Sequence, residues 1–304
     1  MIDCIDNILN NNYDLVLNNN LELIHIISKY SIPEIIKYLI DKNIDLEVKT
    51  NEELRPIHYI CKYSTPEMIK YIIDKGVNLE ATTDYGWRPI HFICVYSTPE
   101  MIKYIIDKNV NLEASINTGF RPIHLICQHC TLEIIKYICD KGIDLDAETN
   151  DKWRPIHLLC TYSCFAPCPE KIKYIIEKGV DLEACIEGCY RPIHLIIKYS
   201  TPEMIKYIID KGVDLEATTD DGWKPIHEIC CRSTPEMIKY IIDKGVDLEA
   251  STEDGTRPAH LICENSTPDM IKYIFSKGVD FEAIDNYFNT PNSICENNRK
   301  LKIK

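Results

Sequence analysis

Residues 84–116 read DYGWRPIHFICVYSTPEMIKYIIDKNVNLEASI, and most of the chain repeats this 33-residue stretch with small changes. Its most constant part is the tripeptide Pro89-Ile90-His91. The histidine recurs every 33 residues, with a single step of 37, at His25, His58, His91, His124, His157, His194, His227 and His260. A fixed period of this length predicts one supersecondary unit stacked on copies of itself.

Each unit is expected to contain two helices joined by turns. Residues 84–86 are a turn signal, and Pro89 suits the first turn of a short helix, where its missing N–H has no partner in any case. Thr98 predicts the N-cap of a second, longer helix with a broad apolar face. That helix ends at a slot that holds only Gly or Asn, the residues that tolerate a left-handed C-cap. The slot is filled by Asn43, Gly76, Asn109, Gly142, Gly179, Gly212, Gly245 and Gly278.

This pattern resembles the ankyrin repeat, whose signature places Thr-Pro-Leu-His at the start of the first helix. The resemblance implies an all-α ankyrin-repeat solenoid of helix-turn-helix units with hairpin fingers. Residues 1–17 are expected to form an N-terminal helical cap, and residues 286–304 a truncated ninth repeat with a basic tail. Eight repeats are expected between them, in residues 18–285, at about 18–50, 51–83, 84–116, 117–149, 150–186, 187–219, 220–252 and 253–285. The isoleucine- and asparagine-rich composition is similar to that of ankyrin proteins of giant DNA viruses of the mimivirus kind.

The repeated histidines are interpreted as framework residues. Packed neighbouring helices lie ~10 Å apart, which is too far for consecutive histidines to share a metal ion. The resemblance implies that they bond to the backbone of the adjoining turn and to the hydroxyl of the signature threonine. This chain has Arg or Lys in place of that threonine, as at Arg88, so the second link is not available here.

Composition narrows the functional classes. The formal net charge of −13 over 304 residues argues against a nucleic-acid or anionic-membrane binder. No secretory signal and no apolar run long enough to span a bilayer is visible. The 15 cysteines mostly follow the repeat register and fit a reducing compartment. We therefore expect a cytoplasmic monomer, in the host cytoplasm if the protein is viral, with no cofactor.

Two parallel stripes on the fingers are the main candidate for partner binding. One slot is mostly aromatic and includes all three tryptophans, and the next slot is basic. Trp, Tyr and Arg are enriched at interface hot spots. The alternative is that each aromatic packs between fingers while its basic neighbour pairs with an acid. The candidate residues, here called the finger stripe, are Trp87, Arg88, Phe120, Arg121, Trp153, Arg154, Tyr190, Arg191, Trp223 and Lys224.

A possible metal site lies in the loops between the helices of two successive repeats. Stacking would bring His129 and Cys130 near Cys164 and Cys168, which the longer repeat carries in its insertion. Four such ligands can form a tetrahedral zinc site, although the spacing of the two cysteines in the insertion is loose. The alternative is that these side chains are ordinary loop residues.

The expected function is a non-enzymatic scaffold that binds a partner protein along the concave face and the fingers. First-helix positions such as Lys62, Val95 and Gln128 differ between repeats, whereas the second helix repeats almost verbatim. No catalytic motif is present. The alternatives are an adaptor for a host ubiquitin-ligase complex and a zinc-stabilised structural repeat protein. Only about eleven residues follow Ser293, too few for a C-terminal ligase-docking module, so an adaptor would dock through its repeats.

Overall fold

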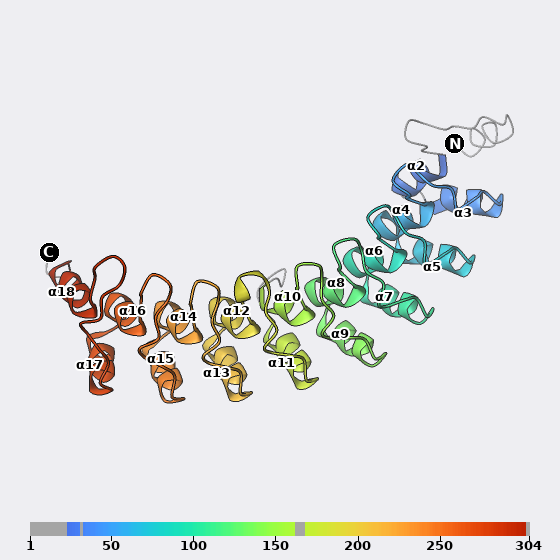
Figure 1. Ribbon diagram of the computed structural model, residues 1–304. Helices are drawn as coiled ribbons and strands as arrows, with labels where there is room; N and C mark the ends of the chain where they lie inside the picture. Colours follow the sequence, from blue (N-terminus) through green and yellow to red (C-terminus); the bar gives the residue numbers. More distant parts are fainter. Residues whose placement is uncertain (1–22, 31–32, 162–167, 302–304) are drawn as a thin grey trace. The chain divides into compact units, whose positions relative to one another are not determined.

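The structure is a computed structural model that describes residues 23–30, 33–161 and 168–301. The predicted cap at residues 1–17, Cys164 and the basic side chains of the tail lie outside this described part. The chain divides into two compact units, Met1–Asn150 and Asp151–Lys304, here called the N-terminal and C-terminal units, and each is described by itself. In each unit the first helices form one row and the second helices another, with the fingers projecting beside the first row (Figure 1).

The described residues contain helices and turns and no strand, which confirms the predicted all-α repeat fold. In the N-terminal unit the first helices are α2 (Leu23–Tyr30), α4 (Pro56–Tyr63), α6 (Pro89–Tyr96) and α8 (Pro122–His129), and the second helices are α3 (Pro33–Asp41), α5 (Pro66–Asp74), α7 (Pro99–Ile106) and α9 (Leu132–Cys139). In the C-terminal unit the first helices are α10 (Pro155–Thr161), α12 (Pro192–Tyr199), α14 (Pro225–Arg232), α16 (Pro258–Asn265) and α18 (Pro291–Leu301). The second helices there are α11 (Pro169–Glu177), α13 (Pro202–Asp210), α15 (Pro235–Ile242) and α17 (Pro268–Ser276), and a short 3-10 turn, η1, spans Glu187–Cys189.

The repeated histidine fixes the start of the first helices α4, α6, α8, α10, α12, α14 and α16. In α6 the N-cap is Arg88, whose extended backbone is followed by Pro89 at the first helical position. The Arg88 N–H donates to His91 Nδ1 at 2.9 Å, so the ring proton is on Nε2, which donates to the Ala114 carbonyl at 3.0 Å. The histidine therefore ties its own helix to the loop that leads to the next finger. The backbone N–H of the arginine takes the place of the missing threonine hydroxyl.

The second helices α5, α7, α13, α15 and α17 begin with the predicted threonine cap, whereas α9 and α11 begin without a side-chain cap bond. Thr98 Oγ1 accepts a hydrogen bond from the Met101 N–H at 3.4 Å, which caps α7. The C-terminal slot adopts positive φ throughout, including 57° at Asn109 and 83° at Gly76. This conformation ends the helix without a steric penalty when the residue is glycine.

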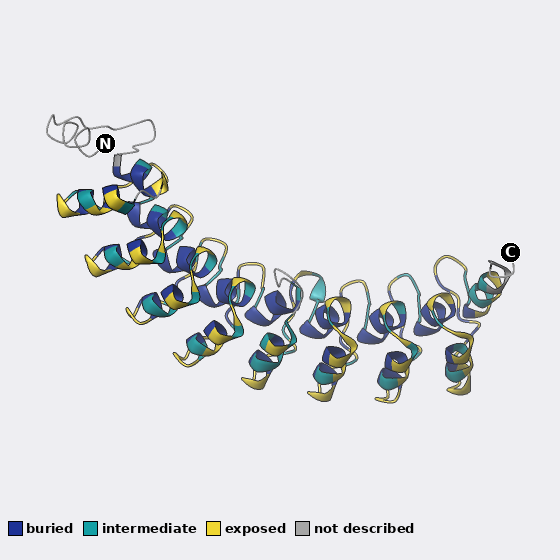
Figure 2. Cartoon of the chain, turned by 180° about the vertical axis from the view of Figure 1, so that it is seen from behind, coloured by how far each residue is buried: buried dark blue, intermediate teal, exposed yellow. Residues whose placement is uncertain are grey.

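The core lies between the two rows of helices. Ile90 and Ile93 of α6 and Ile105 of α7 are at most 1% exposed. Burying one such side chain contributes roughly 1.5–3 kcal/mol. The first helices are buried over most of their surface because, within each unit, successive first helices pack on one another, whereas the second helices keep one exposed side (Figure 2).

Neighbouring second helices are joined by a repeated polar contact, which we call the tyrosine lock. Tyr137 Oη donates to Asp107 Oδ1 at 2.6 Å, and Lys141 Nζ contacts the same oxygen at 2.8 Å. These two bonds lower the pKa of the Asp107 carboxyl. Lys141 and Lys103, the latter from the preceding helix, each lie over the Tyr137 ring. The same lock joins α13 and α15 in the C-terminal unit, which explains why the second-helix sequence hardly changes from repeat to repeat.

Candidate functional site

Each finger is a tight hairpin that fixes the backbone of its aromatic residue. In the finger before α6, the Thr83 N–H donates to the Trp87 carbonyl at 3.0 Å, and the Trp87 N–H donates to Thr83 Oγ1 at 3.1 Å. Gly86, at φ 77°, closes the turn with a bond from its N–H to the Thr83 carbonyl. A Cβ at this glycine would lie 2.8 Å from the Asn117 side chain of the next finger, so the close stacking of fingers requires glycine here.

The aromatic members of the finger stripe are half-buried against their own histidines. Trp87 lies 6.0 Å from the His91 ring and 5.0 Å from the Phe92 ring, measured between ring centroids. The aromatic–histidine contact recurs at Phe120, Trp153, Tyr190 and Trp223. Each ring therefore packs on its own repeat and leaves part of its surface in solvent, and binding of a partner by this slot stays a prediction.

The basic members of the finger stripe form ion pairs within the chain. Arg88 contacts Glu80 at 2.8 Å, and Arg121 bridges Glu113 at 2.6 Å and Asp144 at 3.4 Å. In the C-terminal unit the equivalent pairs are Arg154–Asp181, Arg191–Glu183, Arg191–Asp214 and Lys224–Glu216. The carboxylates also bind backbone, since Glu80 Oε1 accepts from the Asn111 N–H at 2.8 Å. These cations thus hold neighbouring loops together, and the charge-assisted contact to a partner expected from them stays a prediction.

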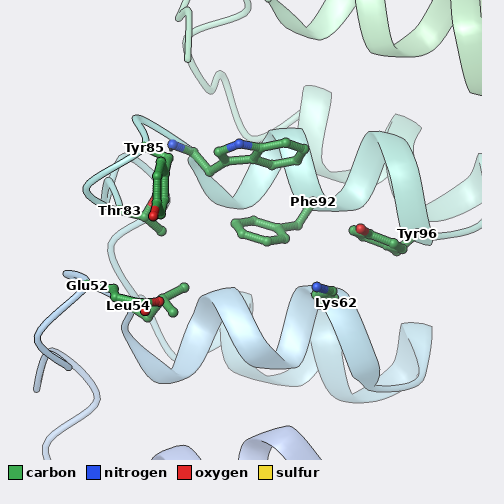
Figure 3. A pocket seen from close by; sticks show the side chains of 8 residues that line it. Glu52, Leu54, Lys62, Thr83, Tyr85, Phe92 and Tyr96 are labelled. Atoms are coloured by element: carbon green, nitrogen blue, oxygen red, sulfur yellow. Dashed lines mark hydrogen bonds between the residues drawn. The ribbon is translucent and has the colours of Figure 1, made fainter. Parts of the chain in front are cut away.

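A pocket opens between α4 and α6 in the N-terminal unit (Figure 3). It has a volume of about 160 Å³, and its walls come from two successive fingers and first helices. Its lining is mainly aromatic and is formed by Glu52, Leu54, Lys62, Thr83, Tyr85, Trp87, Phe92 and Tyr96. We call it the aromatic pocket.

At the pocket, one position of the aromatic slot is occupied by a smaller, aliphatic residue. Leu54 stands in repeat 51–83 where Trp87 stands in the next repeat. Phe92 packs against His58 at 5.7 Å and against Trp87, and so forms the floor between the two repeats. Tyr85 and Tyr96 are 65% and 51% exposed, so aromatic surface is available to a ligand at both ends of the pocket.

Lys62 closes the helix end of the aromatic pocket. Its Nζ lies 5.2 Å from the centroid of Tyr63 and 5.4 Å from that of Tyr96, the distances of cation–π contacts. Glu52 lies at the other end, beside Tyr85 in the fingers (Figure 3). The site therefore combines an apolar centre with one charged group of each sign.

Sequence reasoning named Trp87 and the variable Lys62 but missed Phe92, Tyr96 and Glu52. Phe92 follows the histidine directly, where four other repeats carry leucine and the preceding repeat carries Tyr59. Tyr96 lies five residues after the histidine, in a slot that is tyrosine in most repeats, so neither slot alone separates the repeat with the pocket from its neighbours.

The histidines are held neutral by their surroundings. Burial lowers the pKa of His58 and of His91 from 6.5 to about 4, although the hydrogen bond to a backbone carbonyl acts in the opposite direction. The pKa of His194 and of His227 is lowered for the same reason. A buried neutral imidazole with both nitrogens bonded to backbone is a framework group, which confirms the role expected for it.

The proposed zinc ligands have local partners where they are described. Cys130 Sγ donates to the Cys94 carbonyl at 3.4 Å, and Cys168 Sγ contacts Glu170 at 3.3 Å. Cys164 lies outside the described residues, and within them no three His, Cys, Asp or Glu side chains are arranged to hold a metal ion. A zinc cluster with His129 stays a prediction.

The repeats match the model of a known protein family. The family model described as ankyrin repeats (three copies) matches residues 1–83, 23–116, 57–149, 93–185 and 193–285. The chain belongs to the ankyrin repeat family. Ankyrin repeats generally mediate protein–protein interaction, and their members are typically scaffolds rather than enzymes. No curated protein matches this ankyrin chain.

No helix in the described part of the chain is both long enough and apolar enough to cross a lipid bilayer.

Proposed function

We propose that the N-terminal unit of this ankyrin protein binds an extended segment of a partner protein, with an apolar side chain of that segment in the aromatic pocket. The observation that carries the proposal is the open aromatic lining between α4 and α6, in which Trp87 and Phe92 form a packed wall and Tyr85 and Tyr96 remain exposed. Rigid aromatic surface in a hollow is the usual anchor of a protein interface.

The distribution of polar contacts also supports binding of the partner on the side formed by the first helices and the fingers. Tyr and Lys side chains of the second helices are engaged in the tyrosine lock, whereas first-helix positions at the pocket vary between repeats. A partner that binds the first helices and fingers meets residues that differ along the chain. Such a surface can distinguish one partner segment from another.

Further parts of the proposal rest on the sequence. We propose that the protein acts without catalysis and as a monomer in the cytoplasm, without binding nucleic acid, and that its isoleucine-rich ankyrin sequence has a viral origin and a host partner. An adaptor for a ubiquitin-ligase complex would use the same surface, and a zinc-stabilised scaffold would add the loop cluster. Identification of the partner separates the adaptor from other scaffolds.

The test is selection of peptides from a phage-displayed random library on the immobilised full chain. We expect enrichment of peptides with an apolar or aromatic residue, and loss of their binding to Trp87→Ala. The matched control is Trp223→Ala, since Trp223 fills the same slot but is followed on α14 by Glu228 instead of an aromatic residue. It should bind the selected peptides as the wild type does.

A second variant, Tyr96→Ala, shows whether loss of binding by Trp87→Ala could come from a folding defect alone. Tyr96 is about half exposed, so Tyr96→Ala should retain the wild-type melting temperature and still weaken binding. The proposal is wrong if no peptide is enriched on the wild type, or if selected peptides bind both variants at wild-type affinity.

A further inference from the structure

The two ends of the aromatic pocket carry opposite charges. Glu52 and Tyr85 line the end formed by the fingers, while Lys62 and Tyr96 line the end formed by the last turns of α4 and α6 (Figure 3). Phe92 lies between the two ends, and Leu54 lies beside Glu52 and faces the same apolar space (Figure 3). A ligand that fills the pocket therefore meets a negative group at one end and a positive group at the other.

Both charges lack an ion-pair partner, which distinguishes them from the charges around them. Within the described residues, Arg55 pairs with Glu47 and Arg88 with Glu80, whereas neither Glu52 nor Lys62 has a carboxylate or cationic side chain within ion-pair distance. Lys62 is instead held over the Tyr63 and Tyr96 rings. A cation kept in place by rings but not neutralised can still accept an anionic ligand group.

The repeat register makes this arrangement specific to one pair of repeats. Lysine recurs in the slot of Lys62 at Lys29 and Lys198, and an acid recurs in the slot of Glu52 at Asp151, Asp221 and Asp254, but only repeat 51–83 carries both charges. The opposed charges are therefore not a by-product of the repeat pattern. They occur in the repeat that also has Leu54 in the aromatic slot, and all three residues line the pocket.

We propose that the aromatic pocket selects a partner segment in which an apolar residue lies between a basic and an acidic residue. The basic side chain contacts Glu52, the apolar side chain enters between Leu54 and Phe92, and the acidic side chain contacts Lys62. This inference rests on the proposed function and adds the chemistry of the partner.

The length of α4 sets the spacing of the two charges. The pocket runs along this helix, from Leu54 just before it to Lys62 in its last turn, and the eight residues of the helix span ~12 Å. An extended peptide advances ~3.3 Å per residue, so the basic and acidic residues are expected about four positions apart. The apolar residue lies between them.

The experiment repeats the peptide selection on two single charge reversals of the full chain. On the wild type, enriched peptides should carry one basic and one acidic residue around an apolar one. On Glu52→Lys the basic residue should be replaced by a second acidic residue, and on Lys62→Glu the acidic residue by a second basic one. Neither side chain is in the core, so both variants should fold and bind peptides.

A double-mutant cycle gives a quantitative readout with a synthetic peptide selected on the wild type. Replacement of its acidic residue by the corresponding amide should weaken binding ~2- to 5-fold, as expected for a partly exposed ion pair. The same replacement should have no effect on binding to Lys62→Met. The loss should also shrink in high salt.

The outcomes distinguish this inference from the proposed function. Failure to enrich any peptide on the wild type overturns the proposed function and the inference with it. Enrichment that depends on Trp87 but shows the same charged residues on wild type and both reversals overturns the charge selection alone. The charge selection is also overturned if replacing the acidic residue of the peptide by its amide weakens binding to wild type and to Lys62→Met equally.

Discussion

Mild acid should destabilise this ankyrin chain through its neutral framework histidines, well before its carboxylates titrate. His58 and His91 have a folded-state pKa of about 4, while an unfolded histidine titrates near 6.5. As the pH falls below 6.5, the unfolded chain takes up protons that the folded chain does not, so the folded state loses stability. This loss is complete near pH 4.

The magnitude follows from the two pKa values. Between pH 7.5 and pH 5, one histidine whose pKa falls from 6.5 to about 4 on folding lowers the free energy of unfolding by about 2 kcal/mol. The two histidines together lower it by about 4 kcal/mol, a large part of the stability of an ordinary domain. The lowered pKa of Asp41 and similar carboxylates matters only below their ordinary value of 3.8, and thus outside this window.

Urea unfolding of wild type and His91→Asn, followed by circular dichroism at pH 7.5 and pH 5, measures this effect. The variant should be less stable at pH 7.5, because it loses the bond to the Ala114 carbonyl, but should lose about 2 kcal/mol less than wild type on going to pH 5. Cys94→Ala is the control, because it removes another buried side chain from the same helix. Burial raises the pKa of the Cys94 thiol, so this thiol does not titrate between pH 5 and pH 7.5. If His91→Asn loses as much stability as wild type between the two pH values, the neutral-histidine argument is refuted.

Three other changes test the repeat framework. Gly119→Ala should lower stability by more than ~2 kcal/mol in thermal unfolding, because its φ is +85° and its Cβ would lie 2.5 Å from a backbone nitrogen of the next finger. Gly142→Asn should be nearly neutral, because no atom lies close to this glycine and asparagine occupies the same position in other repeats. Tyr240→Phe removes a 2.6 Å bond of the tyrosine lock and should cost roughly 0.5–1.5 kcal/mol in urea unfolding, and no change would argue against the lock. Native alkylation followed by mass spectrometry should label the exposed Cys185 well before the buried Cys160, whose thiol pKa is raised by burial, and equal rates would contradict the described packing.

Most of the fold could be predicted from the sequence because each repeat contains the residues that cap its own helices and bond to the adjoining loop. Thr98 caps a second helix, Asn109 adopts the left-handed C-cap, and His91 bonds to the backbone of the adjoining loop. These features depend on residues close in the register, so a single repeat is enough to infer them. The repeat boundaries and the N-terminal cap remain predictions.

The site was harder to predict because it depends on side-chain volumes in two repeats at once. The aromatic slot was identified, but its basic neighbour Arg88 is engaged with Glu80, a pairing that the sequence offered only as an alternative. The pocket requires Leu54 to be small, Phe92 to be large and Lys62 to reach Tyr96. No single slot reveals such a combination.

The bonds between repeats have a consequence for how genes of this kind change length. In the 33-residue repeats that the structure describes, tyrosine lock partners are 30 residues apart and the histidine and its carbonyl are 23 apart, so duplication or excision of one whole period leaves these partners in place. In the longer repeat the His157–Ala184 separation is 27 residues, yet the bond persists at 3.1 Å. Unequal recombination between repeats can therefore lengthen or shorten the gene without disrupting the contacts between repeats, while small insertions are accommodated between the two helices of a repeat.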